Sequence, residues 1–274
     1  MTPETTIDAA VALIRSADGI LITAGAGMGV DSGLPDFRGN EGFWNAYPAL
    51  RSAGIPFHEI ANPASFHDQP RRGWGFYGHR LQLYRDTLPH EGFAILLALA
   101  DSKPNACFVY TSNVDGQFQQ AGYAPERIVE CHGSIHHFQC LSRCSDELWP
   151  ADARIAAVDP ATGLMSEPLP HCPRCGGLAR PNILMFNDSE WISDRADRQL
   201  ARFEAWRGSV DRMVVIEVGA GVDIPSVRRM SERQGAPLVR INPRAPVVAR
   251  GHGVGLPLRA LEALRAIDAL WTPS

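Results

Sequence analysis

The segment ILITAGAGMGVDSG, residues 20–33, is the part of the sequence that decides the fold. Its first four residues form a short apolar run, which is typical of a buried parallel strand. The run leads directly into a glycine-rich turn, and glycine lets a backbone approach a pyrophosphate closely when a helix N-terminus follows. The glycine spacing departs from a simple GxGxxG pattern, and such a turn can also be purely structural. The segment therefore predicts a strand, a turn and a helix, with a phosphate site as one of two interpretations.

The rest of the chain alternates between helical and strand patterns. Helices are expected where apolar residues recur at helical spacing, and strands where short apolar runs lie between turns. This alternation predicts an α/β fold, in which a Rossmann-like parallel sheet carries helices on both faces. Residues 40–80 show no long period and predict loops and short helices, within an insertion at 40–90. The expected helices are 6–17, 91–100 and 195–207, and the further strands are 107–111, 127–130, 213–216 and 238–241.

Three short turns follow predicted strands at widely separated places in the sequence. Residues 25–27 follow the first strand, residues 113–115 the second, and residues 219–221 a later one. In an open parallel sheet, ligands bind beyond the carboxyl ends of the strands. The three turns are therefore expected to meet in space and to form one binding site.

Four of the six cysteines fall in a segment whose composition differs from that of the rest. Cys140 and Cys144 form one pair, and Cys172 and Cys175 form a second within CPRCGG. Two pairs at this spacing can complete a tetrahedral zinc site, and a site with four protein ligands is structural because no position stays open for water. The alternative is a set of reduced thiols without metal.

The cysteine-bearing segment also suggests how the chain is divided. The 274 residues, of which 45% are apolar, fit one large α/β domain with an insertion. We expect a Rossmann-like domain of residues 1–135 and 182–274, and a small zinc-binding module of residues 136–181. The pattern of residues 246–274 does not decide whether they cover the site or complete the sheet.

Charge and hydropathy exclude several classes of protein. The net charge is −4 and no long basic run occurs, which argues against a nucleic-acid binder. Residues 1–16 lack the basic start and apolar stretch of a signal peptide. No uncharged apolar run reaches the ~18 residues that a membrane span requires. We therefore expect a cytoplasmic protein with neither a nucleic-acid nor a membrane partner, whose oligomeric state the sequence does not predict.

A longer stretch carries a specific resemblance. Residues 25–39, GAGMGVDSGLPDFRG, closely resemble the sirtuin signature GAG-x-S-x-x-SGIPDFR. Further matches follow in the family's order: TSNVDG at 111–116 resembles TQNIDG, and CHGS at 131–134 resembles HGS. RPNILMF at 180–186 resembles RP-x-VVFF, and residues 219–221 and 241–242 stand where the family has GTS and IN. The resemblance covers roughly residues 7 to 245.

The resemblance implies an NAD⁺-dependent protein-lysine deacylase with a structural zinc ion. In such a reaction the carbonyl oxygen of an acylated lysine attacks the ribose of NAD⁺ as nicotinamide leaves, and the acyl group passes to ADP-ribose. His132 would be the general base toward a ribose hydroxyl, a task that suits an imidazole; without its motif it could equally be a structural histidine. Asn113 and Asp115 would hold the nicotinamide end. The residues expected to bind NAD⁺ are Gly25, Ala26, Gly27, Asp36, Phe37, Arg38, Ser112, Asn113, Asp115, Gly219, Ala220, Gly221 and Asn242.

Several departures from the family keep other functions open. Most of them lie around the cofactor and the peptide groove. A mono-ADP-ribosyltransferase or an NAD⁺ glycohydrolase would use the same cofactor site, and an inactive NAD⁺-sensing protein is a third possibility. The presence of His132 favours deacylation. The departures are Gly29 for serine, Ser112 for glutamine, Phe118 where histidine is common, Met185 for an aromatic residue, Asn187-Asp188 for Gly-Glu, and a segment 219–225 that is one residue shorter than in the family.

One further segment bears on the acylated-lysine protein that would be the substrate. WGFYGHR, residues 74–80, places Tyr77 and Arg80 on one face if it is helical. A hydroxyl and a guanidinium side by side can receive a carboxylate. The segment resembles the sirtuin branch that removes succinyl and malonyl groups. Alternatively, Tyr77 packs in the core and Arg80 points to water. With Phe186, these are the residues expected to contact the substrate.

Overall fold

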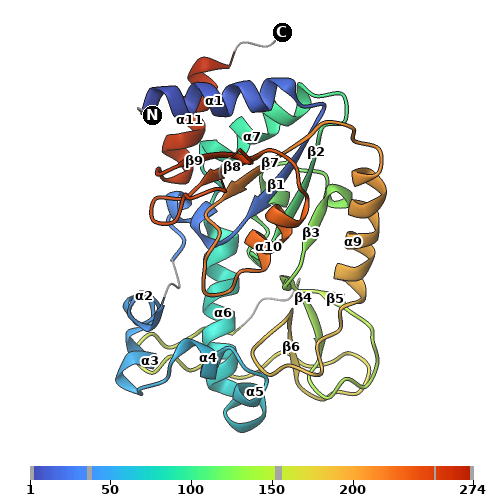
Figure 1. The fold of residues 1–274 in the computed structure, drawn as a ribbon. Coiled ribbons are helices and arrows are strands. Elements are labelled where there is room, and N and C mark those ends of the chain that lie inside the picture. The colour runs from blue at the N-terminus through green and yellow to red at the C-terminus, as the bar shows by residue number, and fades with distance from the viewer. Residues whose placement is uncertain (1–2, 36–38, 152–155, 250, 272–274) are drawn as a thin grey trace.

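A parallel sheet forms the upper half of the molecule. The computed structural model describes residues 3–35, 39–151, 156–249 and 251–271 (Figure 1). Six strands run parallel in the order β3-β2-β1-β7-β8-β9. The chain builds outward from β1 in one direction and from β7 in the other, so the order reverses between these two strands. The strands are β1 Gly19–Ala24, β2 Cys107–Thr111, β3 Ile128–Glu130, β7 Met213–Val218, β8 Leu238–Ile241 and β9 Gly253–Leu256.

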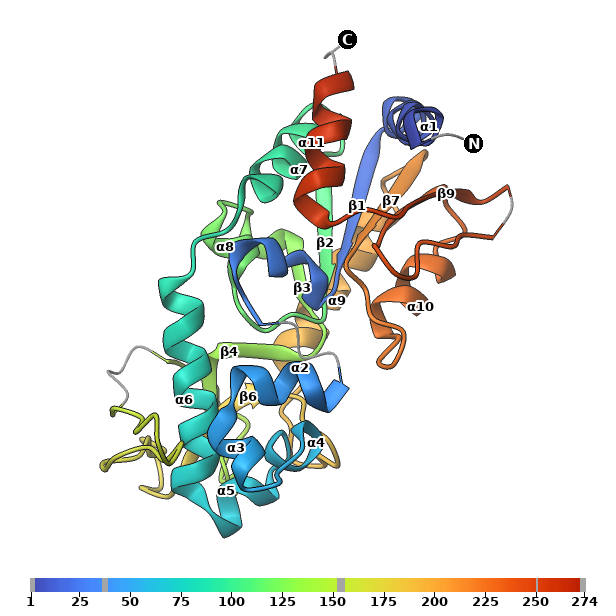
Figure 2. The same ribbon diagram turned by 90° about the vertical axis from the view of Figure 1, so that its left-hand side faces the viewer.

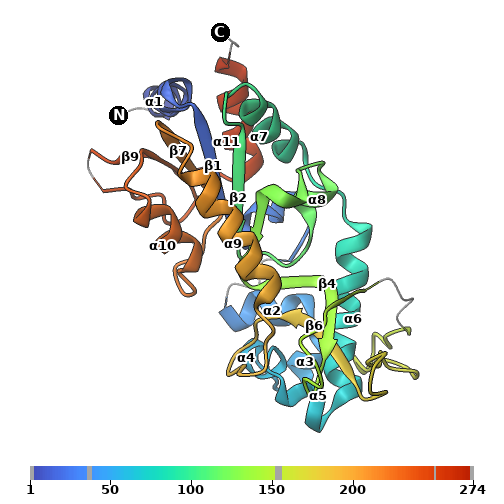
Figure 3. The same cartoon turned by 90° about the vertical axis from the view of Figure 1, so that its right-hand side faces the viewer.

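Helices cover both faces of this sheet, as the alternating pattern predicted. Successive side chains of a strand point to opposite faces. Ile20 and Ile22 of β1 therefore pack in the core under α1, α7 and α11, while Leu21 packs against the face that carries α9 and α10. Figure 3 shows α9 lying along this second face. The helices are α1 Pro3–Ser16, α7 Glu91–Asp101, α8 Gln117–Gln120, α9 Asp194–Arg207, α10 Ser226–Arg233 and α11 Ala260–Leu270.

A second lobe lies below the carboxyl ends of the strands (Figure 2). It contains a small antiparallel sheet in the order β5-β4-β6 and a group of helices. One hydrophobic core joins them, in which Phe66 and Trp74 of the helices pack with Phe138 of β4 and with Met165. The elements are α2 Gly39–Ala46, α3 Pro48–Ser52, α4 Phe57–Ile60, α5 Ala64–Asp68, α6 Pro70–Asp86, β4 Gly133–Cys140, β5 Trp149–Pro150 and β6 Ala179–Ile183.

Helix α6 corrects the expectation of only loops and short helices over residues 40–80. It is 17 residues long although its first half contains three glycines, which lower helix propensity. The structure shows why glycine is used here. A Cβ atom at Gly75 would lie 1.9 Å from the carbonyl oxygen of Gly163. The glycine lets the helix pack closely against another backbone segment, so it is not a turn signal.

The last part of the chain completes the sheet. Strand β9 pairs with β8 as the sixth strand. Helix α11 then packs its buried side chains, among them Leu264 and Ile267, in the core shared with α1 and α7. The described part of residues 246–274 therefore completes the sheet, which the sequence alone did not decide. Among the described residues, no helix is both long and apolar enough to cross a membrane.

Candidate functional site

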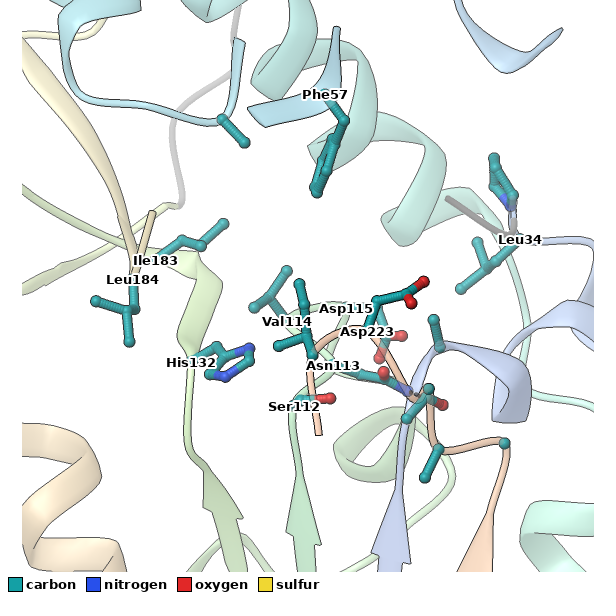
Figure 4. Close-up of a pocket in the computed structure, with 18 of the residues that line it drawn as sticks. Leu34, Phe57, Ser112, Asn113, Val114, Asp115, His132, Ile183, Leu184 and Asp223 are labelled. Carbon is teal, nitrogen blue, oxygen red and sulfur yellow. Dashed lines mark hydrogen bonds between the residues drawn. The ribbon is translucent and has the colours of Figure 1, made fainter. Parts of the chain in front are cut away.

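A cavity of about 800 Å³ lies between the two lobes, at the carboxyl ends of β1, β2, β7 and β8 (Figure 4). It is placed where the strand order reverses, which is where open α/β sheets bind ligands. The three turns predicted to converge all contribute to its wall, so that prediction is confirmed. Of the expected NAD⁺-binding residues, its lining includes Gly25, Ala26, Ser112, Asn113, Asp115, Gly219, Ala220, Gly221 and Asn242.

Two of the turns pack directly against each other. The Gly25 amide donates to the Val218 carbonyl oxygen at 3.0 Å, and the Gly27 amide donates to that of Gly219 at 3.1 Å. A Cβ atom on Gly219, which has φ of 63°, would lie 2.4 Å from the Cα atom of Gly27. Gly27 thus supports the cavity wall from behind and is not part of the lining. The glycines of these turns therefore permit close packing of the two backbones as well as leaving space for a ligand.

The predicted helix after the glycine-rich turn does not form. Two single 3₁₀ turns follow instead, η1 Ala26–Met28 and η2 Val30–Ser32. Gly33 then adopts a left-handed conformation with φ of 91°, which ends the second turn. Three other expected cofactor residues, Asp36, Phe37 and Arg38, lie outside the described residues.

Asn113 and Asp115 follow β2 and are held by different contacts. The Asn113 side-chain amide donates to the Gly25 carbonyl oxygen at 3.1 Å, which ties the second turn to the first. The Asp115 carboxylate accepts from the Gln117 amide at 2.9 Å. Burial is the main cause that raises the pKa of Asp115, to about 6. This carboxyl therefore titrates near pH 6.

His132 follows β3 and points into the cavity (Figure 4). Its Nε2 atom lies 3.4 Å from the hydroxyl oxygen of Ser226, at the start of α10. Burial lowers the pKa of His132, so the ring is mostly neutral at neutral pH and can accept a proton. No local pattern singles out Ser226, because it lies 94 residues after the histidine.

The lower lobe closes the other end of the cavity with side chains of α6. Tyr77 and Arg80 are both buried and both line the cavity, as their spacing on one helix face predicted. Tyr77 also stacks on Phe66 with ring centroids 5.5 Å apart, so it belongs to the core as well. The Arg80 guanidinium does not point to water: its Nε and Nη2 atoms donate to the Tyr84 hydroxyl at 3.0 and 2.6 Å.

Tyr84 is a cavity residue that the sequence reasoning missed. It could have been found, because it lies four residues after Arg80 and residues four apart share a helix face. Phe186, the third expected substrate residue, also lines the cavity. Its ring meets Phe57 edge to face at 5.9 Å, and it stays partly exposed at the rim.

The four predicted metal ligands form one cluster, away from the cavity. The sulfur atoms of Cys140, Cys144, Cys172 and Cys175 all lie within 4.8 Å of one another. The Cys140–Cys175 and Cys144–Cys172 sulfur pairs are each 3.7 Å apart. Four thiolates at such spacing fit zinc and leave no open coordination position. The ion would join the end of β4 to the turn at 172–175.

Comparison with known proteins agrees with this geometry. A model of the Sir2 family matches residues 25–222. The chain is 30% identical to the NAD-dependent protein deacylase of Aquifex aeolicus, over 84% of this chain and 86% of that protein. It is 32% identical to the NAD-dependent protein deacylase 1 of Pseudomonas aeruginosa, over 88% and 89%. The fold matches a crystal structure of a Sir2 homologue in complex with NAD, with a TM-score of 0.71, 23% identity, and coverage of 96% of this chain and 92% of that one. The chain belongs to the Sir2 family, the sirtuins.

Proposed function

We propose that this protein is an NAD⁺-dependent protein-lysine deacylase. The observation that carries the proposal is that His132, Asn113 and Asp115 line one cavity together with the two glycine-rich turns. Relatives that share about a third of its residues are named NAD-dependent protein deacylases. An imidazole kept neutral by burial supports the assignment of a base.

In this proposal each wall of the cavity has a task. The turns that carry Gly25 and Gly219 bind NAD⁺ across the strand ends, with Ser112 and Asn242 beside them. Asn113 and Asp115 hold the nicotinamide end. His132 takes a proton from a ribose hydroxyl, and the chemistry that NAD⁺ supplies is an activated ribose carbon that accepts the acyl oxygen. Asp36, Phe37 and Arg38, which lie outside the described residues, stay expected NAD⁺-binding residues.

The rim of the cavity supports a peptide substrate. Four apolar side chains are exposed there although they line the cavity: Leu184, Phe186, Val222 and Ile224. Exposed apolar side chains gathered at one opening mark a binding surface. We propose that they contact the chain on either side of the acylated lysine, whose side chain enters between the lobes.

We further propose that the acyl groups removed fastest are acidic, such as succinyl and malonyl. Arg80 brings a buried positive charge to the cavity wall, and the groups around it include aromatic rings and the Tyr84 hydroxyl. The guanidinium lies 5.1, 5.7 and 5.3 Å from the ring centroids of Phe76, Tyr77 and Tyr84. A guanidinium retained in such surroundings suits a ligand that carries a carboxylate.

Mass spectrometry of the reaction products tests the proposal. The full-length protein is incubated with NAD⁺ and one peptide that carries acetyl, succinyl or malonyl lysine. A deacylase forms nicotinamide, free lysine and O-acyl-ADP-ribose. Free ADP-ribose without loss of the acyl group would identify an NAD⁺ glycohydrolase instead, and a mass gain on protein would identify an ADP-ribosyltransferase. Equal rates on the three peptides would contradict the acyl preference but leave deacylation intact.

A further inference from the structure

His90 lies outside the cavity lining but makes contact with the glycine-rich turn from behind. It is the N-cap residue of α7, and its Nδ1 atom accepts from the Gly92 amide at 3.0 Å. On the other side of the ring, Nε2 lies 2.8 Å from the carbonyl oxygen of Met28 in η1. A carbonyl oxygen can only accept, so Nε2 carries the proton and donates it. The His90 backbone amide donates to the Ser32 hydroxyl in η2 at 3.0 Å.

The surroundings of the ring leave space for this arrangement. A Cβ atom at Gly92 would lie 2.6 Å from Cε1 of His90, so a side chain there would push the ring away. The ring also packs against Phe93, with centroids 5.0 Å apart. Serine, threonine, aspartate and asparagine are the usual N-cap residues, and they cap a helix with shorter side chains. Capping alone does not require a histidine, whereas reaching Met28 requires its length.

The glycine-rich turn depends on such contacts because it lacks regular structure of its own. It consists of two 3₁₀ turns, whose hydrogen-bond geometry is weaker than that of an α-helix. Helix α7, in contrast, is anchored in the main core by Phe93, Leu96 and Leu99. Besides His90, the described contacts that hold the turn from outside include Asp31, whose carboxylate accepts from the Leu261 amide at 2.9 Å.

We propose that His90 is a positioning residue for NAD⁺ binding: it ties both 3₁₀ turns of the cofactor loop to the start of α7. The inference rests on the proposed function, since it takes residues 25–33 as the NAD⁺-binding turn. Because His90 is not part of the cavity lining, it is expected to touch neither NAD⁺ nor the acylated peptide. Its loss should therefore weaken the binding of NAD⁺ and leave the peptide groove unchanged.

The contacts also predict how NAD⁺ affinity responds to acid. Protonation would place a hydrogen on Nδ1, facing the Gly92 amide, and would abolish the acceptor that caps α7. Burial lowers the pKa of His90. The hydrogen bond to Met28 and the nearby Asp31 of η2 oppose this, and Arg265 of α11 adds to it. Arg265 is itself paired with Glu91, and Arg259 lies beside Asp31. The neutral form, which caps α7 and reaches Met28 at the same time, thus predominates at neutral pH. Acidification below the ordinary range of histidine removes the cap at the start of α7, while Nε2 still donates to Met28.

The test separates capping from tethering. In His90→Asn, the shorter side chain can still cap α7 but cannot reach Met28. The dissociation constant of NAD⁺ is measured on the full chain by calorimetry, together with the melting temperature and the KM for acylated peptide at saturating NAD⁺. We expect NAD⁺ to bind roughly threefold to tenfold more weakly, the effect of one lost hydrogen bond. The melting temperature and the peptide KM should stay close to those of the unmodified protein. The matched control is His67→Asn, in an exposed position of α5, which should change none of the three.

A second measurement keeps the inference open to refutation. The loss of NAD⁺ affinity on acidification should be smaller in His90→Asn than in the unmodified protein, because asparagine has no ring nitrogen that acid can protonate and thereby remove as the cap of α7. Ser32→Ala should weaken NAD⁺ binding in the same direction. Unchanged NAD⁺ affinity in a stable His90→Asn protein would overturn the inference. So would weaker NAD⁺ binding that comes with a comparable rise in the peptide KM and a lower melting temperature. If the unmodified protein binds no NAD⁺, the proposed function is overturned along with it.

Discussion

His132 is the single residue on which the proposed chemistry depends most directly. It lines the cavity, and its ring is half-buried beside Ser226. His132→Ala should abolish NAD⁺-dependent deacylation while NAD⁺ still binds, because the glycine-rich turns are untouched. General-base catalysis contributes about 10²–10⁴-fold to a rate. Turnover and NAD⁺ affinity measured side by side check this, and near-normal turnover in the variant would show that His132 is not the base.

Two side chains of the site should give the reaction a steep dependence on acid. Burial lowers the pKa of His132, so its base form is present above that lowered value and lost as the pH falls through it. Burial raises the pKa of Asp115 to about 6, so its carboxylate is likewise present above that value and lost below it. We expect kcat/KM to be level near neutral pH and to fall with two protons below about pH 6. In Asp115→Asn, the residual activity should fall with one proton, and an unchanged slope would contradict this assignment.

Arg80 decides the proposed acyl preference. Arg80→Met keeps much of the length of the side chain and removes the charge that a succinyl or malonyl carboxylate would meet. A charge-assisted hydrogen bond contributes roughly 1.5–3 kcal/mol, so the preference over acetyl should fall on the order of tenfold to a hundredfold. The ratio of kcat/KM values on succinyl and acetyl peptides measures it. Tyr84→Phe, which removes the hydroxyl that holds the guanidinium, should lower the same ratio by less. A ratio that Arg80→Met leaves unchanged would mean that another group binds the carboxylate.

At the scale of elements, helix α6 joins the acyl end of the cavity to the core of the lower lobe. Its glycines permit close packing against another backbone segment, although they lower the helix propensity of this stretch. The Arg71 side chain donates to the Met165 carbonyl oxygen at 2.9 Å, and the Met165 amide donates back to the Arg71 carbonyl oxygen at the same distance. The helix that carries Tyr77 and Arg80 is thereby fixed to the segment around Gly163. A change at this contact should be transmitted to the cavity wall.

Gly75→Ala tests this packing. Alanine in a helix is normally more stable than glycine by about 1 kcal/mol. Here its Cβ atom would meet the Gly163 carbonyl oxygen at 1.9 Å, and a backbone atom cannot move aside at little cost. We expect a net loss of about 1–3 kcal/mol in the free energy of unfolding, as for an overpacked core. Gly73→Ala in the same helix is the control, because its nearest atom lies at 3.1 Å and its effect should be smaller. Urea unfolding of the two variants compares them, and equal stability would refute the packing argument.

At the scale of the whole molecule, two lobes enclose one cavity, and the zinc site belongs to only one of them. The main sheet contributes the NAD⁺ side, and the lower lobe contributes α6 and the rim around Phe186. The zinc-binding cysteines lie in the lower lobe. NAD⁺ binding and peptide binding should therefore respond differently to changes in the two lobes, although the chain is continuous through both.

Removal of zinc tests this division. The purified protein is expected to contain one zinc ion per chain, because four thiolates complete a closed site. Chelation, or Cys172→Ser, should lower the melting temperature, since the free energy of binding structural zinc contributes to folding. The peptide KM should rise more than the dissociation constant of NAD⁺, because the ion lies in the substrate-side lobe. Cys107→Ser, in β2 of the main core, is the contrasting variant and should leave the zinc content unchanged. Protein purified without chelator and found free of zinc would contradict the assignment.

The sequence by itself determined the features that depend on nearby residues. The apolar runs at β1, β2, β7 and β8 predicted the sheet, because a strand buried on both faces must be apolar throughout. The glycine-rich turn at Gly25, the pair of residues Asn113 and Asp115, and the paired cysteines are short motifs whose spacing is local. A general rule for parallel sheets then predicted that the turns would meet. The roles of these residues stay predictions.

Only the tertiary structure decided which distant side chains face one another. Ser226 meets His132 across 94 positions of the chain, and His90 reaches Met28 across 62. The packing role of Gly75 in α6 could not be predicted, because the backbone that it faces, at Gly163, is far away in the sequence. The expected helix after Gly25 gave way to two 3₁₀ turns because the turn packs against Gly219 and is held by contacts from α7. Such pairings follow from how the two lobes pack, and no local pattern in the sequence records them.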